Sequence, residues 1–475
     1  MMHKFKLLGK DKRNNVKKND SQQNDDNNHP SDSGRKLISR NAVICSSGKD
    51  KYHHDSERAE IPVRSVNNEL EHVPSSPSPS SLSLMTNNLK VSPIHASRQS
   101  MYSASDFRSS SSTLLSRQNS QVVKRHTVVN RMKLESPILI DGKFQNPWIN
   151  HKVPTFTNIL KLGLSNEKRH IPSKKELNNL LPILEPNIKS HPPLNGLRIT
   201  WLGHSTILAE FDNISVLTDP IFSERASPSQ VFGPKRYRDS PCTIHDLPSS
   251  LDAVIISHSH YDHLDLNSVV LLNARYGNDL RWFIPRGLGD WFSRMECDNI
   301  VELDWWETNC LPDKGDVSFV FTPAQHWSKR TLTDDNRSLW GSWVVKGPRF
   351  KFFFTGDTGF CEVFKRIGSI YGPFDVAAIP IGTYEPRKQM KHQHINPGEA
   401  VQLHKDLKSR FSIGIHWGTF AFSSEHFLDP PNKLRSELER SKISTKKFVT
   451  FMHGETRIIY EDGKIEHPFQ NKLSN

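Results

Sequence analysis

Residues 258–263 hold four potential metal ligands: His258, His260, Asp262 and His263. They directly follow the apolar run 253–256, which is typical of a buried strand that ends where a loop begins. His258 and His260 leave one face of an extended segment together, whereas Asp262 and His263 begin the next turn and can face a second metal. Neutral imidazole and carboxylate groups suit a borderline cation such as Zn²⁺. A lone histidine in a polar loop is usually only solvated, but this spacing predicts a metal site.

Three later apolar runs also stop at a potential ligand. The run 319–323 leads to His326, the run 352–356 leads to Asp357, and the run 412–415 leads to His416. His326 taken alone is as readily a core residue as a ligand. A centre with two metal ions needs more side chains than residues 258–263 hold, including one that bridges the ions. The recurrence of ligands at strand ends therefore predicts that these three residues complete a dinuclear centre.

This order of ligands resembles the metallo-β-lactamase superfamily. Residues 200–205 and 217–220 are similar to the opening strands of that fold, in which Asp219 would be the carboxylate that orients the ligand loop. The resemblance implies an α/β, four-layer αββα sandwich that holds two Zn²⁺ ions per chain. It assigns to one ion His258, His260 and His326, and to the other Asp262, His263 and His416. Asp357, together with a hydroxide, would bridge the two ions.

Further segments narrow the resemblance: 219–229, 233–236, 302–307, 325–332, 339–343, 379–387 and 416–420. Together they resemble the N-acylphosphatidylethanolamine-hydrolysing phospholipase D family, from about Phe144 to the C-terminus. That family implies hydrolysis of an N-acylated phosphatidylethanolamine, held in a membrane surface, to an N-acylethanolamine and phosphatidic acid. The expected mechanism is direct attack of the bridging hydroxide on phosphorus, so no side-chain nucleophile is required. The paired HxKxxxxD motifs of phospholipases D that form a phosphohistidine do not occur in this sequence.

Residues near the ligands are expected to act on the substrate. Tyr261 lies between metal ligands, and its phenol can reach a phosphate oxygen. Gln393 and His394 occupy a position that the family uses near the substrate headgroup, where His394 can donate to the phosphodiester or serve as a structural partner. Lys329 and Arg330 either attract anionic lipid or form a solvated face. The expected catalytic residues are therefore Asp357, Tyr261, His394 and Gln393.

The 475 residues divide into two parts of different composition. Residues 1–135 are rich in Ser, Asn, Gln and Lys, and they bury too little apolar surface to offset their ordering entropy. We expect them to form a disordered, basic, low-complexity tail. They carry 22 Lys and Arg against 13 Asp and Glu, which leaves only +3 of the net charge of +12 for residues 136–475. These residues are expected to form the catalytic domain, which has an ordinary size for a four-layer sandwich.

The composition of the chain indicates where the protein is located and what it binds. The chain has no apolar run that approaches the roughly 20 residues of a membrane-spanning helix, and its N-terminus is too polar for a secretory signal. Five scattered cysteines without a CxxC pair predict a reducing, intracellular compartment. A peripheral location on an endomembrane or a mitochondrial membrane is expected. The basic N-terminus is compatible with anionic lipid, with a solvated tail or with a mitochondrial presequence, and a homodimer is left open.

Residues 136–195 are expected to form an N-terminal strap. Residues 146–164 form a candidate membrane-docking element within it, because Trp148 is of a type that prefers the headgroup interface and the segment ends in an apolar patch. A strap packed on the catalytic core explains the same residues equally well.

Other classes of function are open alternatives. A lactonase or an RNA-processing nuclease of the same fold would use the same ligands, but the Trp340-Gly341 and 384–386 segments weigh against both. A nuclease would also carry its basic excess beside the site, so no nucleic-acid partner is expected. A non-catalytic membrane adaptor built on this scaffold is a further alternative. The complete ligand set argues against it, because degenerate members usually lose ligands.

Overall fold

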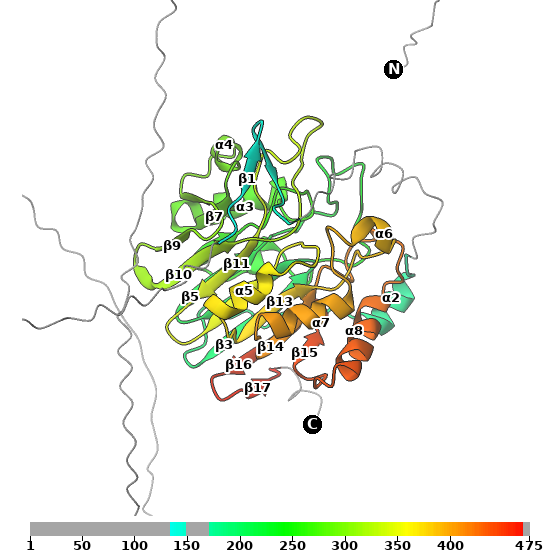
Figure 1. The fold of residues 1–475 in the computed structure, drawn as a ribbon. Coiled ribbons are helices and arrows are strands. Elements are labelled where there is room, and N and C mark those ends of the chain that lie inside the picture. The colour runs from blue at the N-terminus through cyan, green and yellow to red at the C-terminus, as the bar shows by residue number, and fades with distance from the viewer. Residues whose placement is uncertain (1–133, 149–170, 469–475) are drawn as a thin grey trace, which may run out of the picture. The chain divides into compact units, whose positions relative to one another are not determined.

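Two β-sheets packed face to face form the core of the computed structural model, which describes residues 134–148 and 171–468 (Figure 1). The eight-stranded sheet has the order β17 (Ile465–Glu466), β16 (Thr456–Tyr460), β3 (Gly196–Gly203), β4 (Thr206–Phe211), β5 (Ile214–Thr218), β6 (Ala253–Ile255), β7 (Arg281–Pro285) and β8 (Ile300–Leu303). The seven-stranded sheet has the order β15 (Phe448–Thr450), β14 (Phe411–Ile415), β13 (Val376–Pro380), β12 (Lys351–Phe354), β11 (Ser342–Lys346), β10 (Lys314–Thr322) and β9 (Thr308–Leu311). Residues 1–133 of the predicted tail and residues 149–170 of the predicted strap lie outside the described residues.

Each sheet combines antiparallel and parallel strands. In the eight-stranded sheet β3, β4 and β5 are antiparallel neighbours, and β5 to β8 are parallel. In the seven-stranded sheet β9 to β12 are antiparallel, and β12 to β15 are parallel. Ligands of open α/β sheets bind outside the carboxyl ends of such strands. The polar segments that follow β6, β12 and β14 therefore lie where a ligand-binding site is expected.

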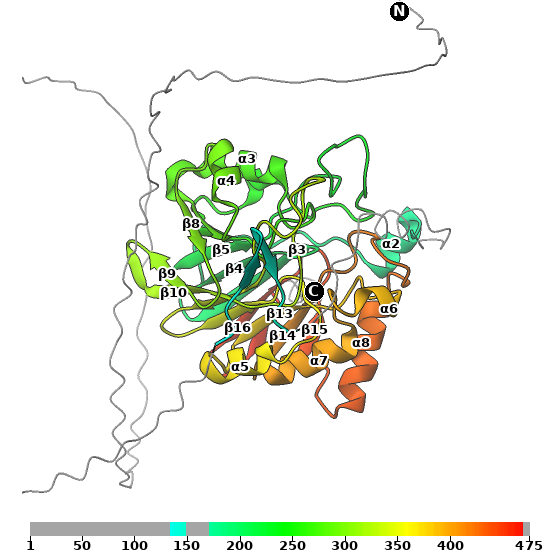
Figure 2. The same ribbon diagram turned by 45° about the horizontal axis from the view of Figure 1, so that its top comes forward.

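Helices cover the outer faces of both sheets (Figures 1 and 2). On the eight-stranded sheet lie α3 (Leu266–Tyr276) and α4 (Gly289–Arg294). On the seven-stranded sheet lie α5 (Val363–Ile370) and α7 (Pro397–Asp406), with α8 (Asp429–Arg440) beside α7 and β15. The shorter elements are β1 (Ile138–Ile140), β2 (Lys143–Gln145), α2 (Lys174–Leu180), α6 (Arg387–Met390) and the 3₁₀ turns η1 (Ile244–Asp246) and η2 (Gly277–Asp279).

Side-chain alternation along β6 shows why the strand reads as a continuous apolar run. Ala253 and Ile255 belong to the core between the two sheets. Val254 and Ile256 belong to a second cluster with the buried side chains of α3 and α4. Because successive side chains of a strand point to opposite faces, both faces of this sheet are covered.

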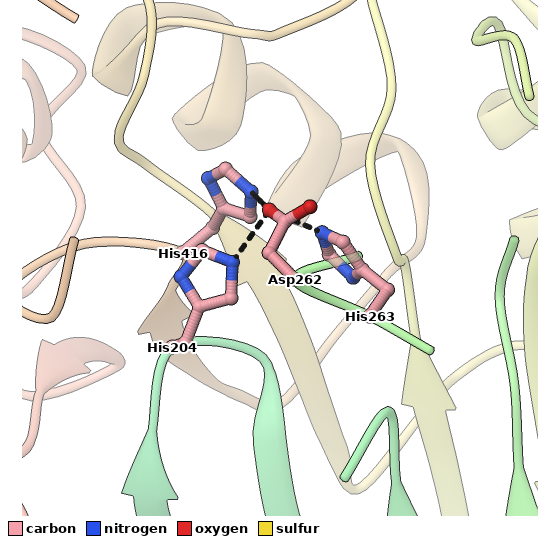
Figure 3. Close-up of side chains that lie close together, drawn as sticks. All are labelled: His204, Asp262, His263 and His416. Atoms are coloured by element: carbon pink, nitrogen blue, oxygen red, sulfur yellow. Dashed lines mark hydrogen bonds and ion pairs between the residues drawn. The ribbon is translucent and has the colours of Figure 1, made fainter. Parts of the chain in front are cut away.

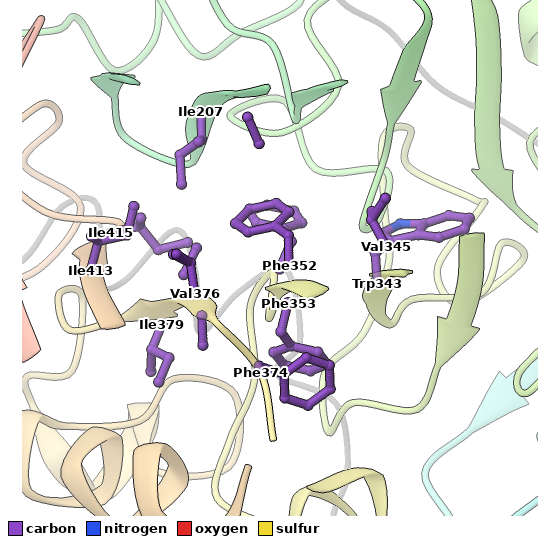
Figure 4. Close-up of a cluster of buried hydrophobic side chains, with 14 of the residues drawn as sticks. Ile207, Trp343, Val345, Phe352, Phe353, Phe374, Val376, Ile379, Ile413 and Ile415 are labelled. Carbon is purple, nitrogen blue, oxygen red and sulfur yellow. The ribbon is translucent and has the colours of Figure 1, made fainter. Parts of the chain in front are cut away.

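The seven-stranded sheet is buried on both faces in the same way. Phe352 of β12 lies toward Ile207 of the opposite sheet, whereas Phe353 points the other way, toward Phe374 (Figure 4). The ring centroids of Phe353 and Phe374 are 5.1 Å apart. Two sheets that each carry helices on the outside make four layers, so the predicted αββα sandwich is confirmed.

The described part of the strap packs on the core. Phe144 of β2 is only 3% exposed. Trp148 stacks on Trp305, with ring centroids 5.8 Å apart and an interplanar angle of 29°. The Asn146 amide donates a hydrogen bond of 2.8 Å to the backbone carbonyl of His326. This geometry is that of the core-packed strap, and the apolar segment 156–164 lies outside the described residues.

Candidate metal centre

The predicted ligands follow strands of both sheets. The segment 258–263 follows β6 of the eight-stranded sheet. His326, Asp357 and His416 follow β10, β12 and β14 of the seven-stranded sheet. Gly356 makes the turn before Asp357 with a φ of +62°, and a Cβ there would lie 2.6 Å from the Cβ of Ser257. Glycine at this position therefore allows the two strand ends to approach each other.

The loop 258–263 is fixed by its own turn and by the helix that follows it. Its turn is closed by the backbone N–H groups of His263 and Leu264, which both donate to the carbonyl of His260. Asp265 then caps α3, because its side chain accepts a hydrogen bond from the Ser268 N–H. A capped helix directly after the loop holds the ligand side chains on a rigid base.

One group of ligands consists of His258, His260 and His326. The His258 Nε2 atom lies 2.8 Å from His260 Nδ1, which lies 3.3 Å from His326 Nε2. His258 and His326 are buried, and His260 is half-buried. These three nitrogens lie close enough together to hold one metal ion.

A second group is centred on Asp262 (Figure 3). Asp262 Oδ2 lies 3.2 Å from His263 Nε2 and 3.4 Å from His416 Nε2. His204 also points into this group, with its Nε2 atom 2.9 Å from the same oxygen. The ligand atoms of these four residues all lie within 4.8 Å of one another.

Asp357 lies between the two groups. Its Oδ2 atom is 3.1 Å from His263 Nε2 and 3.2 Å from His416 Nε2. The same oxygen is 3.9 Å from His258 Nε2 and 3.8 Å from His326 Nε2. One carboxylate therefore contacts one group and borders the other, which is the position that a bridging ligand requires.

The residues present fit a bound metal. Among the described residues, His263 Nε2, His416 Nε2 and Asp357 Oδ1 are buried without a hydrogen-bond partner. Buried polar atoms are normally hydrogen-bonded, so these three atoms suit a bound cation. Two ligand atoms that bind the same tetrahedral Zn²⁺ ion, each at about 2.0–2.1 Å from it, lie roughly 3.3 Å from each other. The separations of 3.1 to 3.4 Å around Asp262 and Asp357 match that spacing.

Outer partners fix the orientation of the imidazole rings. The Asp219 carboxylate lies 2.7 Å from His263 Nδ1 and accepts from the Ser257 N–H at 2.7 Å and the Ser257 hydroxyl at 2.5 Å. The backbone carbonyl of Gln393 accepts from His326 Nδ1 at 2.9 Å. A histidine held through one ring nitrogen presents the other to a metal. Asp219 thus contacts both the predicted ligand His263 and Ser257, the residue directly before the ligand loop.

The charges at the centre suit a cation. Burial lowers the pKa of His326 to about 3 and that of His260 to about 4, so both rings are neutral at pH 7. Burial opposes ionisation of Asp357, but the neighbouring histidines, His263 first, hold its pKa well below the usual range. Burial would also lower the pKa of His416, yet Asp357 and Asp262 raise it to about 9. A proton and a metal ion therefore compete for the His416 ring.

The three predicted substrate-side residues have different surroundings. The Tyr261 hydroxyl donates 2.9 Å to the backbone carbonyl of Arg330, and the Arg330 guanidinium lies 4.2 Å over the Tyr261 ring. The Gln393 side chain accepts from Trp327 Nε1 at 2.7 Å. Tyr261 and Gln393 thus have protein partners for these side-chain atoms.

His394 reaches the centre itself. Its Nδ1 atom lies 3.8 Å from Asp357 Oδ2 and has no hydrogen-bond partner within the described part of the chain. Its ring lies 5.4 Å from that of His326 and 5.2 Å from that of His416. Of the three predicted substrate-side residues, His394 is the one placed beside both ligand groups.

Sequence reasoning did not identify His204 as a site residue. It lies within residues 200–205, which resemble the opening strands of the fold. The available signal was the one that identified His416, a histidine directly after a buried strand, here after Gly203 at the end of β3. A single polar residue gave too weak a pattern to stand out.

A pocket opens beside His416. It is lined by Tyr237, Gly382, Thr383, Trp417, Phe420, Glu425 and Phe427, among others. The Glu425 carboxylate accepts hydrogen bonds from the backbone N–H groups of Thr383 at 2.5 Å and Glu385 at 3.1 Å. These bonds fix two walls of the pocket against each other. The pocket combines apolar walls such as Phe420 and Phe427 with polar ones such as Thr383 and Glu425.

Comparisons with known proteins give a matching family model and a similar solved structure. A family model described as a β-lactamase superfamily domain matches residues 215–417, which include all seven predicted ligands. A metallo hydrolase of known structure from Ignicoccus hospitalis aligns with a TM-score of 0.44 and 21% identity, over 56% of this chain and 98% of that chain. The fold and the family model define this protein as a metal-dependent hydrolase of the β-lactamase superfamily.

Two relatives identify the family more narrowly. The chain is 40% identical over 344 residues to N-acyl-phosphatidylethanolamine-hydrolyzing phospholipase D 1 of Caenorhabditis elegans, covering 67% of this chain and 96% of that protein. It is 33% identical over 340 residues to the mitochondrial N-acyl-phosphatidylethanolamine-hydrolyzing phospholipase D of Saccharomyces cerevisiae, covering 63% of this chain and 72% of that protein. The chain belongs to the N-acyl-phosphatidylethanolamine-hydrolyzing phospholipase D family, as its motifs predicted.

Proposed function

We propose that this enzyme hydrolyses N-acylphosphatidylethanolamine to an N-acylethanolamine and phosphatidic acid, using two zinc ions. The observation that carries the proposal is the arrangement of two ligand groups around one Asp357 oxygen, in a chain of this family. A pair of divalent cations suits a phosphodiester, because it can clamp the oxygens on both sides of an in-line displacement.

In this proposal each zinc ion would be held by residues that follow strands of both sheets. One ion would be held by His258, His260 and His326 and the other by Asp262, His263 and His416, and Asp357 would be shared between them. Bound there, the ions lower the pKa of water toward neutrality and neutralise charge on the phosphoryl group. Asp219 and the Gln393 carbonyl keep the His263 and His326 rings in place.

His394 is the residue that we propose acts on the phosphodiester. Its unpartnered Nδ1 atom beside Asp357 can donate a hydrogen bond to a phosphate oxygen. Gln393 acts mainly through its carbonyl, as a positioning residue for His326. Tyr261 can donate to the substrate only by exchanging its hydrogen bond to the Arg330 carbonyl. We therefore rank His394 above Tyr261 in its contribution to the rate.

A phospholipid substrate would require the enzyme to work at a lipid surface. Within the described ranges, no helix combines the length and the apolar character needed to cross a membrane. We propose a peripheral association with an intracellular membrane. The yeast relative is named mitochondrial, which makes mitochondria the first compartment to examine by fractionation.

The products released from a panel of lipids test the function directly. We expect purified protein to release N-acylethanolamine and phosphatidic acid from N-acylphosphatidylethanolamine, and to cleave phosphatidylcholine and plain phosphatidylethanolamine far more slowly. The Asp357→Asn protein in the same assay controls for contaminating lipases. Cleavage of phosphatidylcholine at a similar rate would refute the narrow specificity. Turnover of a lactone or an RNA in place of every lipid would favour the alternative hydrolases.

The contacts of Trp148 predict a structural rather than a membrane role for this residue. A Trp to Ala change in a core costs about 3–5 kcal/mol, and we expect Trp148→Ser to cost roughly half of that, because the side chain is half-buried. The melting temperature is expected to fall by several degrees, and turnover of soluble and bilayer substrates to fall together. Leu139→Ser, at a position 49% exposed on the neighbouring hairpin, is the matched control and should leave the melting temperature unchanged. A normal melting temperature with loss of bilayer turnover alone would return the docking role to Trp148.

A further inference from the structure

His204 is tied to the second ligand group through its backbone as well as its ring. Its carbonyl accepts the N–H of His416 at 2.9 Å and the indole N–H of Trp201 at 3.0 Å. Its own N–H donates 2.8 Å to the Thr419 hydroxyl, which lies 3.0 Å from His453 Nε2. These bonds hold a residue with a φ of +52°, a conformation that is uncommon outside glycine.

The His204 ring is equally constrained. It is 1% exposed, and its centroid lies 4.2 Å from that of His416. Phe420 and Phe422 meet it edge-on, with centroids 5.2 and 5.7 Å away. The ring is thereby aimed at Asp262, as Figure 3 shows, and it has little freedom to turn away.

The separation of His204 and Asp262 indicates a hydrogen bond. The His204 Nε2 to Asp262 Oδ2 distance of 2.9 Å is the usual length of such a bond. The distances from Asp262 Oδ2 to His263 and His416 are 3.2 and 3.4 Å, close to the spacing of two ligands on one metal. A carboxylate oxygen accepts hydrogen bonds, so in this contact His204 Nε2 is the donor and Asp262 Oδ2 the acceptor.

We infer that His204 is a positioning residue for one of the two metal sites, holding the Asp262 carboxylate by its ring and His416 by its backbone. This inference rests on the proposed dinuclear centre. Within the described residues, none of the hydrogen bonds of His204 reaches the other ligand group, which consists of His258, His260 and His326. Loss of the His204 side chain therefore weakens one site and spares the other.

Metal titration of two matched variants tests this inference. His204→Phe keeps a ring against Phe420 but removes the donor to Asp262. His204→Gln keeps a donor, because its amide nitrogen can occupy the place of Nε2. We expect zinc titrated into demetallated His204→Phe to bind the first site with native affinity and the second with a Kd raised about 10- to 100-fold, as for other residues that orient ligands. We expect His204→Gln to restore most of the second affinity.

His404 supplies a control for the loss of a buried histidine. It is 5% exposed on α7, and its Nδ1 atom lies 2.8 Å from the Ser412 hydroxyl rather than from a ligand. His404→Phe is expected to leave both zinc affinities unchanged, whatever its effect on the melting temperature.

The outcomes distinguish a failure of the His204 inference from a failure of the proposed dinuclear centre. Two native affinities in His204→Phe would overturn the inference, as would an equal loss in His204→Phe and His204→Gln with a lowered melting temperature. A native chain that takes up a single zinc ion would overturn the dinuclear proposal itself, and the inference with it.

Discussion

Asp357→Asn is expected to lower kcat/KM for phosphodiester hydrolysis by about 10³-fold or more, while the protein stays folded. The substitution keeps the shape of the side chain but removes the negative charge that lies within 3.1 to 3.9 Å of ligands of both groups. Two cations without a shared carboxylate repel each other, and they lose the ligand that fixes their separation. A loss of about 4 kcal/mol in transition-state stabilisation corresponds to that factor. Steady-state kinetics, with circular dichroism for the fold, measure the effect.

Two variants control for the Asp357 result. Asp375→Asn also removes a buried carboxylate, but Asp375 pairs with Arg410 at 2.7 Å, so stability and not rate is expected to change. Tyr261→Phe should lose no more than about 10²-fold, because the phenol is at most a hydrogen-bond donor to the substrate. Equal and total loss in Tyr261→Phe and Asp357→Asn, with normal metal content in both, would reverse our ranking of these residues.

Removal of metal is expected to abolish activity, and added zinc to restore it. All seven predicted ligands lie in one centre that contains unpaired buried atoms, so active protein should hold two ions per chain. Elemental analysis of purified protein, followed by assays after chelation and after stepwise return of zinc, makes the measurement. A chelated sample that remains folded by circular dichroism and regains activity with zinc excludes loss through unfolding. Full activity with one ion or fewer per chain would contradict a dinuclear mechanism.

The fold could be predicted because each ligand follows the end of a strand, so the ligands and the strands locate one another in the sequence. Buried runs such as 253–256 end at polar residues in a fixed order, and this order was the strongest signal in the chain. Which face of β6 meets the other sheet could not be predicted, because Ala253, Val254, Ile255 and Ile256 are all apolar. Only the positions of the helices decide between the two faces.

Only some residues of the candidate site could be predicted from the sequence. Residues 258–263 stood out because neighbouring positions reinforce one another. His204 did not, because its role depends on contacts with Asp262 and His416, which are 58 and 212 positions further along the chain. The direction of the Tyr261 side chain depends on the carbonyl of Arg330, another long-range partner. Local patterns identify residue types suited to chemistry, but long-range packing decides their partners.

Both ligand groups draw side chains from both sheets, and this arrangement has a consequence for the life of the protein in a cell. An ion bound in either group is a removable cross-link between the two halves of the sandwich, which must be released before the halves separate. Metal loading and folding are therefore linked by mass action, since any ion that binds the folded chain raises its stability with the free ion concentration. Chain made while the metal is scarce would open more often and be exposed longer to proteases. The supply of metal would then set how much of this enzyme a cell retains, in addition to how fast each copy works.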